Sequence, residues 1–238
     1  MAKQQSYPTL NEMAANLAVD LGSIEVVKWE LYDYNQYPTA GINNLGFFLT
    51  GQGQGQSSAT GAAAGAVKTA ADTNLTGAGV LPAPQAMWVD DIEVLCEPGS
   101  SAGANIFLTQ IPAAFAAVGL ATVQAGAHDV HALLTTGGLQ FNVSQKPYYQ
   151  AAPLYRAPPK TRIQYDVALA TNSASTAEIV KERLYATGQI LHLDPGVGIM
   201  TAQNFGVNLA WPVVVATPSG FNARLGVILS GWLFRGVQ

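Results

Sequence analysis

The sequence predicts an all-β protein, folded as an antiparallel sandwich or barrel. Eight segments of the 238-residue chain have the composition of strands, without regular helices between them, which favours antiparallel over alternating β/α architecture. In several of these segments apolar and polar residues alternate, so that one face of each strand lies in a core. Eight is the strand count of a jelly roll. We therefore expect a single jelly roll with long loops, and a compact double jelly roll is the alternative.

A short helix is expected at the start of the chain. Thr9 and Glu12 have the spacing of a capping box, and a helix over 9–20 would form an N-terminal arm within residues 1–22. Such an arm could clamp a neighbouring subunit or close the end of a barrel. The apolar positions that share one helical face are Leu10, Met13, Ala14 and Leu17.

The jelly-roll domain is expected over residues 23–238. Its strand segments are 24–34, 45–50, 87–97, 139–143, 163–169, 189–193, 205–211 and 222–238. Two of the connections have the composition of short helices, within 105–120 and within 173–185.

The terminal segment, residues 222–238, is the most informative one because both of its faces are apolar. Its only charges are Arg224 and Arg235. A strand that is apolar on both faces must be covered on both sides, so it is either central in its sheet or its outer face meets another subunit. Leu225, Val227 and Leu229 occupy one face, and Ile228, Trp232 and Phe234 the other. The residues we expect at assembly contacts are Leu225, Val227, Ile228, Trp232, Phe234, Leu10, Met13 and Leu17.

The composition favours a protein that packs against copies of itself. Charged residues make up 11% of the chain, against about 25% in an ordinary soluble domain, and charge is depleted in the cores of interfaces. A neutral, secreted-type β protein is the alternative. The net charge of −4 comes without any basic run, which argues against direct or sequence-specific binding of nucleic acid.

The start of the sequence lacks the apolar stretch of a secretory signal. Uncharged apolar runs also fall short of the ~18 residues that a spanning helix needs. We therefore expect a protein made in the cytoplasm, without a membrane span.

Residues 51–86 form a Gly- and Ala-rich insertion. Low-complexity sequence of this kind cannot build a core alone, so we expect it to be mobile in a free monomer and ordered by neighbours in an assembly. Its glycine-rich start lacks the GK[ST] ending of a phosphate-binding loop.

The sequence gives no positive sign of catalysis, and we expect neither an enzyme nor a cofactor. His128 and His131 are weak candidates for a metal site, which would need a third ligand such as His192. A cupin signature is absent. Cys96 continues an apolar face and is expected to be a buried structural thiol.

Two neighbouring carboxylates have the residue types of an acid/base pair, but their spacing argues against one. Asp90 and Asp91 are consecutive in a strand, so they should point to opposite faces. Asp90 falls on the apolar face that we assign to Trp88 and Ile92, where a buried carboxylate needs a partner. The expected partner is Arg224 or Arg162.

Several segments resemble the major capsid proteins of tailless icosahedral bacteriophages. The segments are Ala71–Gln85, Gly138–Tyr148, Ala152–Leu154, Gln203–Pro212 and Leu229–Gln238. The last is similar to an ending L-x-G-x-x-x-R-P-V-Q, with Gly236 in place of the proline.

This resemblance implies a jelly-roll shell protein of the virion. Its partners would be copies of itself in trimeric or pentameric capsomers and other capsid subunits, with an internal lipid membrane reached through other proteins. The alternative function is a carbohydrate- or receptor-binding jelly roll, such as a spike or lectin-like module. Its sugar-stacking candidates are Tyr148, Tyr149, Tyr155 and Trp88.

Overall fold

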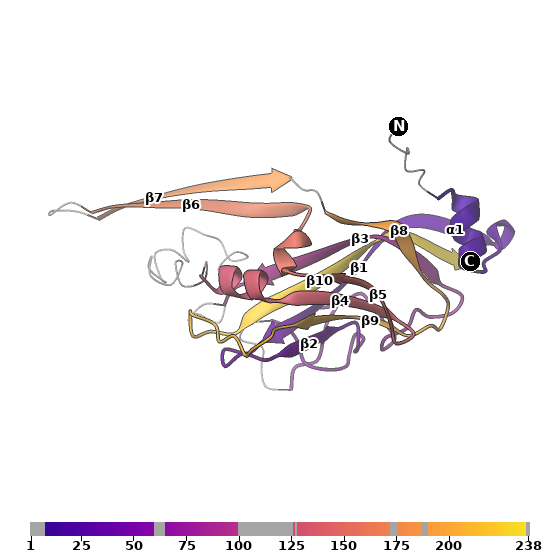
Figure 1. Cartoon of the computed structure of the whole chain (residues 1–238), viewed down its shortest axis with the longest axis horizontal. Helices are drawn as coiled ribbons and strands as arrows, with labels where there is room; N and C mark the ends of the chain where they lie inside the picture. The colour runs from indigo at the N-terminus through magenta and orange to yellow at the C-terminus, as the bar shows by residue number, and fades with distance from the viewer. Residues whose placement is uncertain are drawn as a thin grey trace.

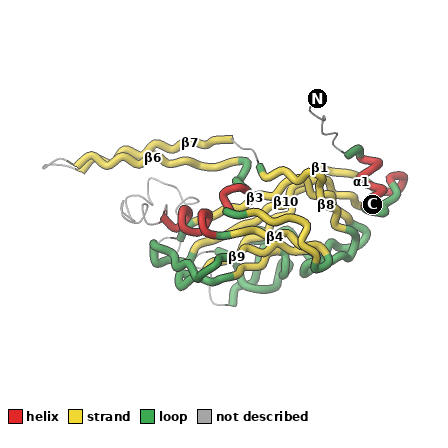
Figure 2. The backbone as a smooth tube through the Cα atoms, viewed as in Figure 1, coloured by secondary structure: helices red, strands yellow, loops and turns green. Residues whose placement is uncertain are grey.

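The computed structural model of the chain describes residues 8–59, 65–99, 126, 128–171, 176–186 and 190–236. The described residues form the expected all-β sandwich of two four-stranded antiparallel sheets (Figures 1 and 2). Sheet A has the order β1 (Ile24–Tyr37), β10 (Ala223–Gly236), β3 (Ala86–Glu97) and β8 (Leu191–Ile199). Sheet B has the order β2 (Asn44–Phe47), β9 (Phe205–Ala210), β4 (Gly138–Val143) and β5 (Lys146–Ala151).

The strands of the sandwich pair in a nested way. β1 pairs with β10, β2 with β9, β3 with β8 and β4 with β5, each time antiparallel. The chain is thus folded back on itself around the β4–β5 turn. Each successive pair, from β4–β5 to β1–β10, joins strands that are further apart in sequence. Two further pairings, of β10 with β3 and of β4 with β9, complete the two sheets.

The terminal strand is central, as its two apolar faces predict. β10 lies between β1 and β3, and its Leu229 is paired with Leu31 on one side and Ile92 on the other. Leu225, Val227 and Leu229 are fully buried between the sheets. This inner face packs against side chains of sheet B such as Phe141 and Leu209.

A short helix of the same chain covers part of the outer face of sheet A. α1 (Leu10–Asn16) begins with the predicted capping box of Thr9 and Glu12, and it ends earlier than expected. Met13 of α1 and Leu17, which caps its C-terminus, are buried together with Trp88 and Phe234. None of the helices in the described ranges is long and apolar enough to cross a membrane.

A β-bulge at Asp90 changes which residues of β3 share a face, compared with the prediction. The register of β3 shifts between Val89 and Asp91 against both of its neighbours, so that one extra residue interrupts the alternation. Trp88 therefore belongs to the cluster under α1, whereas Ile92 belongs to the core between the sheets. The prediction that these two residues share a face was wrong, because it assumed an uninterrupted pleat.

The described part of the Gly- and Ala-rich insertion is packed. It runs along the free edge of β1, where the Tyr34 amide donates to the Asp72 carbonyl over 2.8 Å and the Tyr32 amide donates to Asn74 Oδ1 over 3.0 Å. Leu75 and Leu81 are buried in the main core. The expectation of a loosely held insertion is corrected here, since these contacts occur within a single chain, and they also protect an edge that could otherwise pair with another strand.

Two strands lie outside the sandwich. β6 (Thr161–Thr171) and β7 (Thr176–Ala186) pair only with each other and form a ribbon that projects from the body (Figure 1). The helix predicted within 173–185 was wrong over β7, because pairing with β6 overrides the helix propensity of its Glu, Lys and Arg residues. The helix predicted within 105–120 lies outside the described residues, and residues 128–136 form a helix that was not predicted.

Truncation of Phe234 will test the burial of the outer face of β10. Phe234 is fully buried under α1, so Phe234→Ala should lower the free energy of unfolding by about 3–5 kcal/mol. Tyr148→Ala serves as the control, because Tyr148 is 54% exposed. Urea unfolding measures both, and equal midpoints for the two variants would contradict the packing of α1 on this strand.

Candidate functional site

Most of the predicted contact residues lie in the core of the protomer. Leu225, Val227 and Phe234 have no exposed surface; Met13 and Leu17 are 3% exposed. Ile228 and Trp232 are partly buried, and Leu10 is 43% exposed. The accessible surfaces of the folded chain must therefore be sought elsewhere.

The outer face of sheet A beyond α1 is a network of charges. Lys160, the residue directly before β6, places Nζ 3.1 Å from Glu30 Oε1, 3.4 Å from Glu93 Oε1 and 3.0 Å from Ser230 Oγ. Its own main-chain amide donates to Glu93 Oε2 over 2.7 Å. Burial alone would lower the pKa of the Lys160 ammonium, but the hydrogen bonds and charges of Glu30 and Glu93 outweigh it and raise that pKa.

Asp90 is buried on this face, and its partner is Lys28 rather than the predicted Arg224. The side chain of the other predicted partner, Arg162, lies outside the described part of the structure. Lys28 Nζ lies 3.2 Å from Asp90 Oδ2 and also 4.8 Å from the centre of the Trp232 ring. Arg224 instead contacts Glu97 over 2.9 Å and lies over the ring of Tyr34 at 3.9 Å. The register explains the difference, because Arg224 is paired with Glu97 at the far end of β3, whereas Asp90 lies near the paired Trp88 and Trp232.

The edge of the sandwich beside β1 holds a buried ion pair. Lys68 Nζ lies 2.5 Å from Asp33 Oδ1, and their side chains are 2% and 0% exposed. The Phe48 amide donates to the other carboxylate oxygen, Oδ2, over 2.6 Å. Burial raises the pKa of the Asp33 carboxyl, against the opposing effect of Lys68. This pair ties the insertion to β1.

Asp72 forms a second polar centre in the insertion. Its Oδ2 accepts hydrogen bonds from the Thr69 amide over 2.9 Å and from Ser57 Oγ over 3.1 Å, and Oδ1 accepts from the amide and hydroxyl of Ser58. Burial opposes the charged form, but these hydrogen bonds outweigh it and hold the pKa of the carboxyl below its usual value. Ser58 in turn accepts from Arg224 Nε over 2.8 Å, which links the insertion to β10.

The candidate metal residues do not converge. His128 and His131 are exposed on the helix over 128–136, whereas His192 on β8 lies 2.7 Å from Asp91 Oδ1. Within the described ranges, no three His, Cys, Asp or Glu residues are grouped so that they could hold a metal ion. Cys96 packs against the main core, and burial raises the pKa of its thiol.

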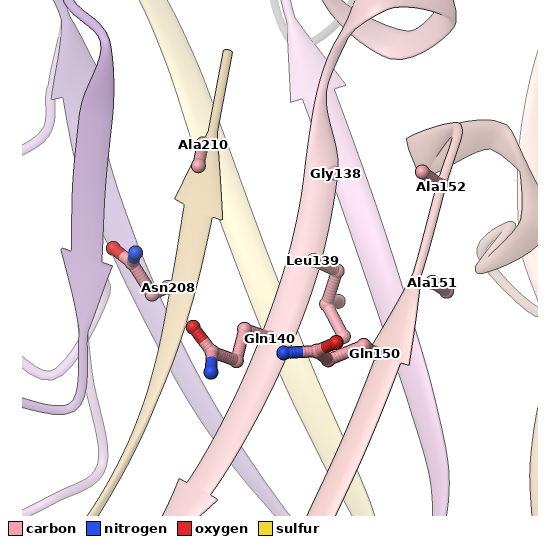
Figure 3. Close-up of a pocket in the computed structure, with 8 residues that line it drawn as sticks. All are labelled: Gly138, Leu139, Gln140, Gln150, Ala151, Ala152, Asn208 and Ala210. Atoms are coloured by element: carbon pink, nitrogen blue, oxygen red, sulfur yellow. The ribbon is translucent and has the colours of Figure 1, made fainter. Parts of the chain in front are cut away.

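The outer face of sheet B carries a shallow, uncharged groove that sequence reasoning missed. Gln140 on β4 is paired with Gln150 on β5 and with Asn208 on β9, so three amide side chains lie across three strands (Figure 3). The groove has a volume of about 310 Å³, and small residues such as Gly138 and Ala210 leave room between the amides. The alternation of β4 and β9 could have indicated it, because their polar positions hold amides rather than charges.

The amides of this groove are available to a ligand or a partner. Within the described part of the chain, the side chains of Gln140, Gln150 and Asn208 have no hydrogen-bonding partner. Asn208 also lines a second groove of about 420 Å³ on the same face, which includes Leu49, 60% exposed. Amides provide both donors and acceptors but no charge, so this face suits neutral polar groups.

No known protein family, curated protein or solved structure matches the chain.

Removal of the buried lysine will test the ion pair. Lys68→Met leaves the Asp33 carboxylate buried without its partner, which should cost about 3–5 kcal/mol of unfolding free energy. Lys146→Met is the matched control, since Lys146 is exposed on β5, and it should change stability by less than about 0.5 kcal/mol. The double variant Asp33→Asn/Lys68→Met should lose less than Lys68→Met alone. Chemical unfolding of these three variants tests the ion pair. A Lys68→Met midpoint equal to that of Lys146→Met would refute the pairing.

The lowered pKa of Asp72 predicts an acid-dependent contribution to stability. A carboxyl whose pKa is lower in the folded state stabilises the fold fully above its unfolded pKa of about 3.9, and this contribution is lost as the pH falls through the folded value. Asp72→Asn should therefore cost about 2–3 kcal/mol at pH 7 and progressively less as the pH falls below about 4. Urea unfolding of both proteins along a pH series measures this, and a pH-independent difference would argue against it.

Proposed function

We propose that the chain is a single-jelly-roll capsid protein that self-assembles into the icosahedral shell of a tailless bacteriophage. The observation that carries the proposal is the nested pairing of eight strands into two four-stranded sheets. When the β6–β7 ribbon is set aside, the first strand pairs with the last, the second with the next to last, and so on inward. That winding supports the proposal of a jelly roll, an architecture of viral shell proteins.

One roll accounts for the sandwich strands better than two. A double jelly roll needs about 16 strands in four sheets, whereas the described residues contain two four-stranded sheets and one separate two-stranded ribbon. The long segments outside the sheets, including the insertion on β1, decorate this one roll.

Three of the five segments that carry the resemblance to phage capsid proteins belong to the strands of the sandwich. Gly138–Tyr148 spans β4 and the start of β5, Gln203–Pro212 contains β9, and Leu229–Gln238 contains the second half of β10. These three segments form strands of both sheets, so the resemblance includes the framework as well as the insertion and a connection.

In this proposal the chain acts through contacts between copies. Its partners are identical subunits in trimeric or pentameric capsomers and other capsid proteins of the virion, and any internal membrane is contacted through those other proteins. Closed symmetry repeats each contact around the shell, so individually weak interfaces suffice. No catalysis, cofactor or nucleic-acid recognition is part of the proposed role.

The groove on sheet B favours one alternative, a carbohydrate-binding jelly roll. Its unpaired amides could hydrogen-bond to sugar hydroxyls, and Tyr148 and Tyr155 are 54% and 57% exposed. Trp88 is 6% exposed under α1, so it is no longer a candidate for stacking on a sugar. A glycan array separates the two functions, because only the alternative predicts a hit that Gln140→Ala abolishes.

Purified full-length protein should form higher oligomers or particles. Light scattering after size exclusion should give masses that are multiples of the protomer's 24.9 kDa, and electron micrographs should show rings or shells. Assembly should strengthen with protein concentration, since each added contact is bimolecular. A protein that stays strictly monomeric across concentration and salt would contradict the proposed function.

A further inference from the structure

The ion pair between Lys68 and Asp33 brings an amine and a carboxyl group into contact inside the protein. The Lys68 side chain is 2% exposed, the Asp33 side chain has no exposed surface, and Nζ lies 2.5 Å from Oδ1. Asp33 lies on the side of β1 that also carries Leu31, a residue of the main core. The lysines of the other described pairs with Asp or Glu, Lys28 and Lys160, are 54% and 36% exposed. Lys68 is therefore the lysine among them that is withdrawn from solvent.

The main chain holds both partners of this pair in place. Asp33 lies within β1, which is paired with β10 along its whole length. The Lys68 amide donates to the Gln54 carbonyl over 3.2 Å, and its carbonyl accepts from the Gly53 amide over 2.8 Å. Two groups that are held in contact react as if they were present at a very high concentration. The fold thus supplies the proximity that a reaction between this amine and this carboxyl group needs.

Burial favours the neutral forms of the two groups. Two buried ions lose their hydration, and their mutual attraction offsets this loss only in part. Burial raises the pKa of the Asp33 carboxyl, although Lys68 opposes the rise. Transfer of one proton from Nζ to Oδ1 gives an amine with a free lone pair and a carboxylic acid. These are the two forms that condense to an amide.

We propose that Lys68 and Asp33 condense into an intramolecular amide, an isopeptide bond that joins the insertion covalently to β1. After the first proton transfer the Nζ lone pair attacks Cγ of Asp33. The Phe48 amide donates to Oδ2 over 2.6 Å, so it stabilises the negative charge that develops on this oxygen. Oδ1 accepts a second proton from Nζ and the Cγ–Oδ1 bond breaks. Oδ1 leaves as water, Oδ2 remains as the amide oxygen, and no oxidant or reductant is consumed.

The product removes the two charges from the interior and closes a covalent ring. An amide is neutral, so its burial costs less than the burial of two ions. The ring contains residues 33–68, which include β2 and the start of the insertion. A covalent link between distant residues reduces the freedom of the unfolded chain, so it strengthens the attachment of the insertion to β1. The bond forms within one protomer and needs no neighbouring copy.

Mass spectrometry of the full-length protein tests the bond. Purified protein that is held at neutral pH until its mass is constant should weigh one water molecule less than its sequence requires. Lys68→Arg should keep its full mass, because the guanidinium stays protonated and is not a nucleophile. Lys160→Arg is the matched control and should lose the same water as the parent, since Lys160 is partly exposed. Thermal unfolding checks that both variants are folded.

Trypsin locates the bond in the parent protein without any substitution. Residues 29–68 follow Lys28, end at Lys68 and contain no other lysine or arginine, so an unlinked chain releases them as one peptide. An acylated Lys68 has no positive charge for trypsin to recognise. Cleavage after Lys68 should therefore be lost, and the longer peptide should lack one water. A parent of full mass that is cleaved normally after Lys68 would overturn the proposal, as would a loss of water that persists in Lys68→Arg.

Discussion

The fold depends on one constraint, which is that β10 must be covered on both faces and paired on both edges. Leu225, Val227 and Leu229 form part of the core between the sheets, and Phe234 forms part of the cluster beneath α1. β1 and β3 hold its two edges. Every other strand of the sandwich is positioned by pairing with these strands or by packing against them. A chain that satisfies this constraint buries its most apolar segment without help from a neighbour.

Several charges of the protein form internal networks. The Lys68–Asp33 pair ties the insertion to β1, and Arg224 joins β10 to both Glu97 and Ser58. The outer face of sheet B, by contrast, presents amides and small residues. A buried pair contributes less to stability than its Coulomb attraction suggests, because both partners lose their hydration. Its clearest effect is to specify one docking position for an insertion of low sequence complexity.

The sequence alone was sufficient to predict the elements whose residue pattern is local. Alternation in β4 and β9, the two apolar faces of β10 and the capping box of α1 all predicted the structure found. β5 was missed because Pro147 and the Tyr148–Tyr149 pair break the alternation, and an edge strand tolerates both. β7 was missed because charged residues with good helix propensity can equally well occupy a two-stranded ribbon.

The remaining differences come from long-range structure. No local signal marks the bulge at Asp90, which reassigns Trp88 to the outer face. The partnership of Lys68 with Asp33 joins residues from separate segments, and the amide groove needs three strands in one register. These residues are recognisably polar in the sequence, but only the pairing of strands shows which polar residues meet. Five of the eight predicted contact residues, such as Leu225 and Phe234, are used in the protomer's own core, because apolar positions suited to an interface are equally suited to a core.

The nested pairing has a consequence for the order of events during synthesis. β1 leaves the ribosome first of the described strands, but its partner in sheet A is β10, the last of these strands along the chain. Until then the edge of β1 that pairs with β10 has no partner strand. Contacts between segments that are distant in sequence form slowly. The nascent chain therefore remains partly unfolded until β10 emerges. During that time its exposed apolar surface can associate with other nascent chains on neighbouring ribosomes. α1, which packs on Phe234, can settle only after that final strand has arrived.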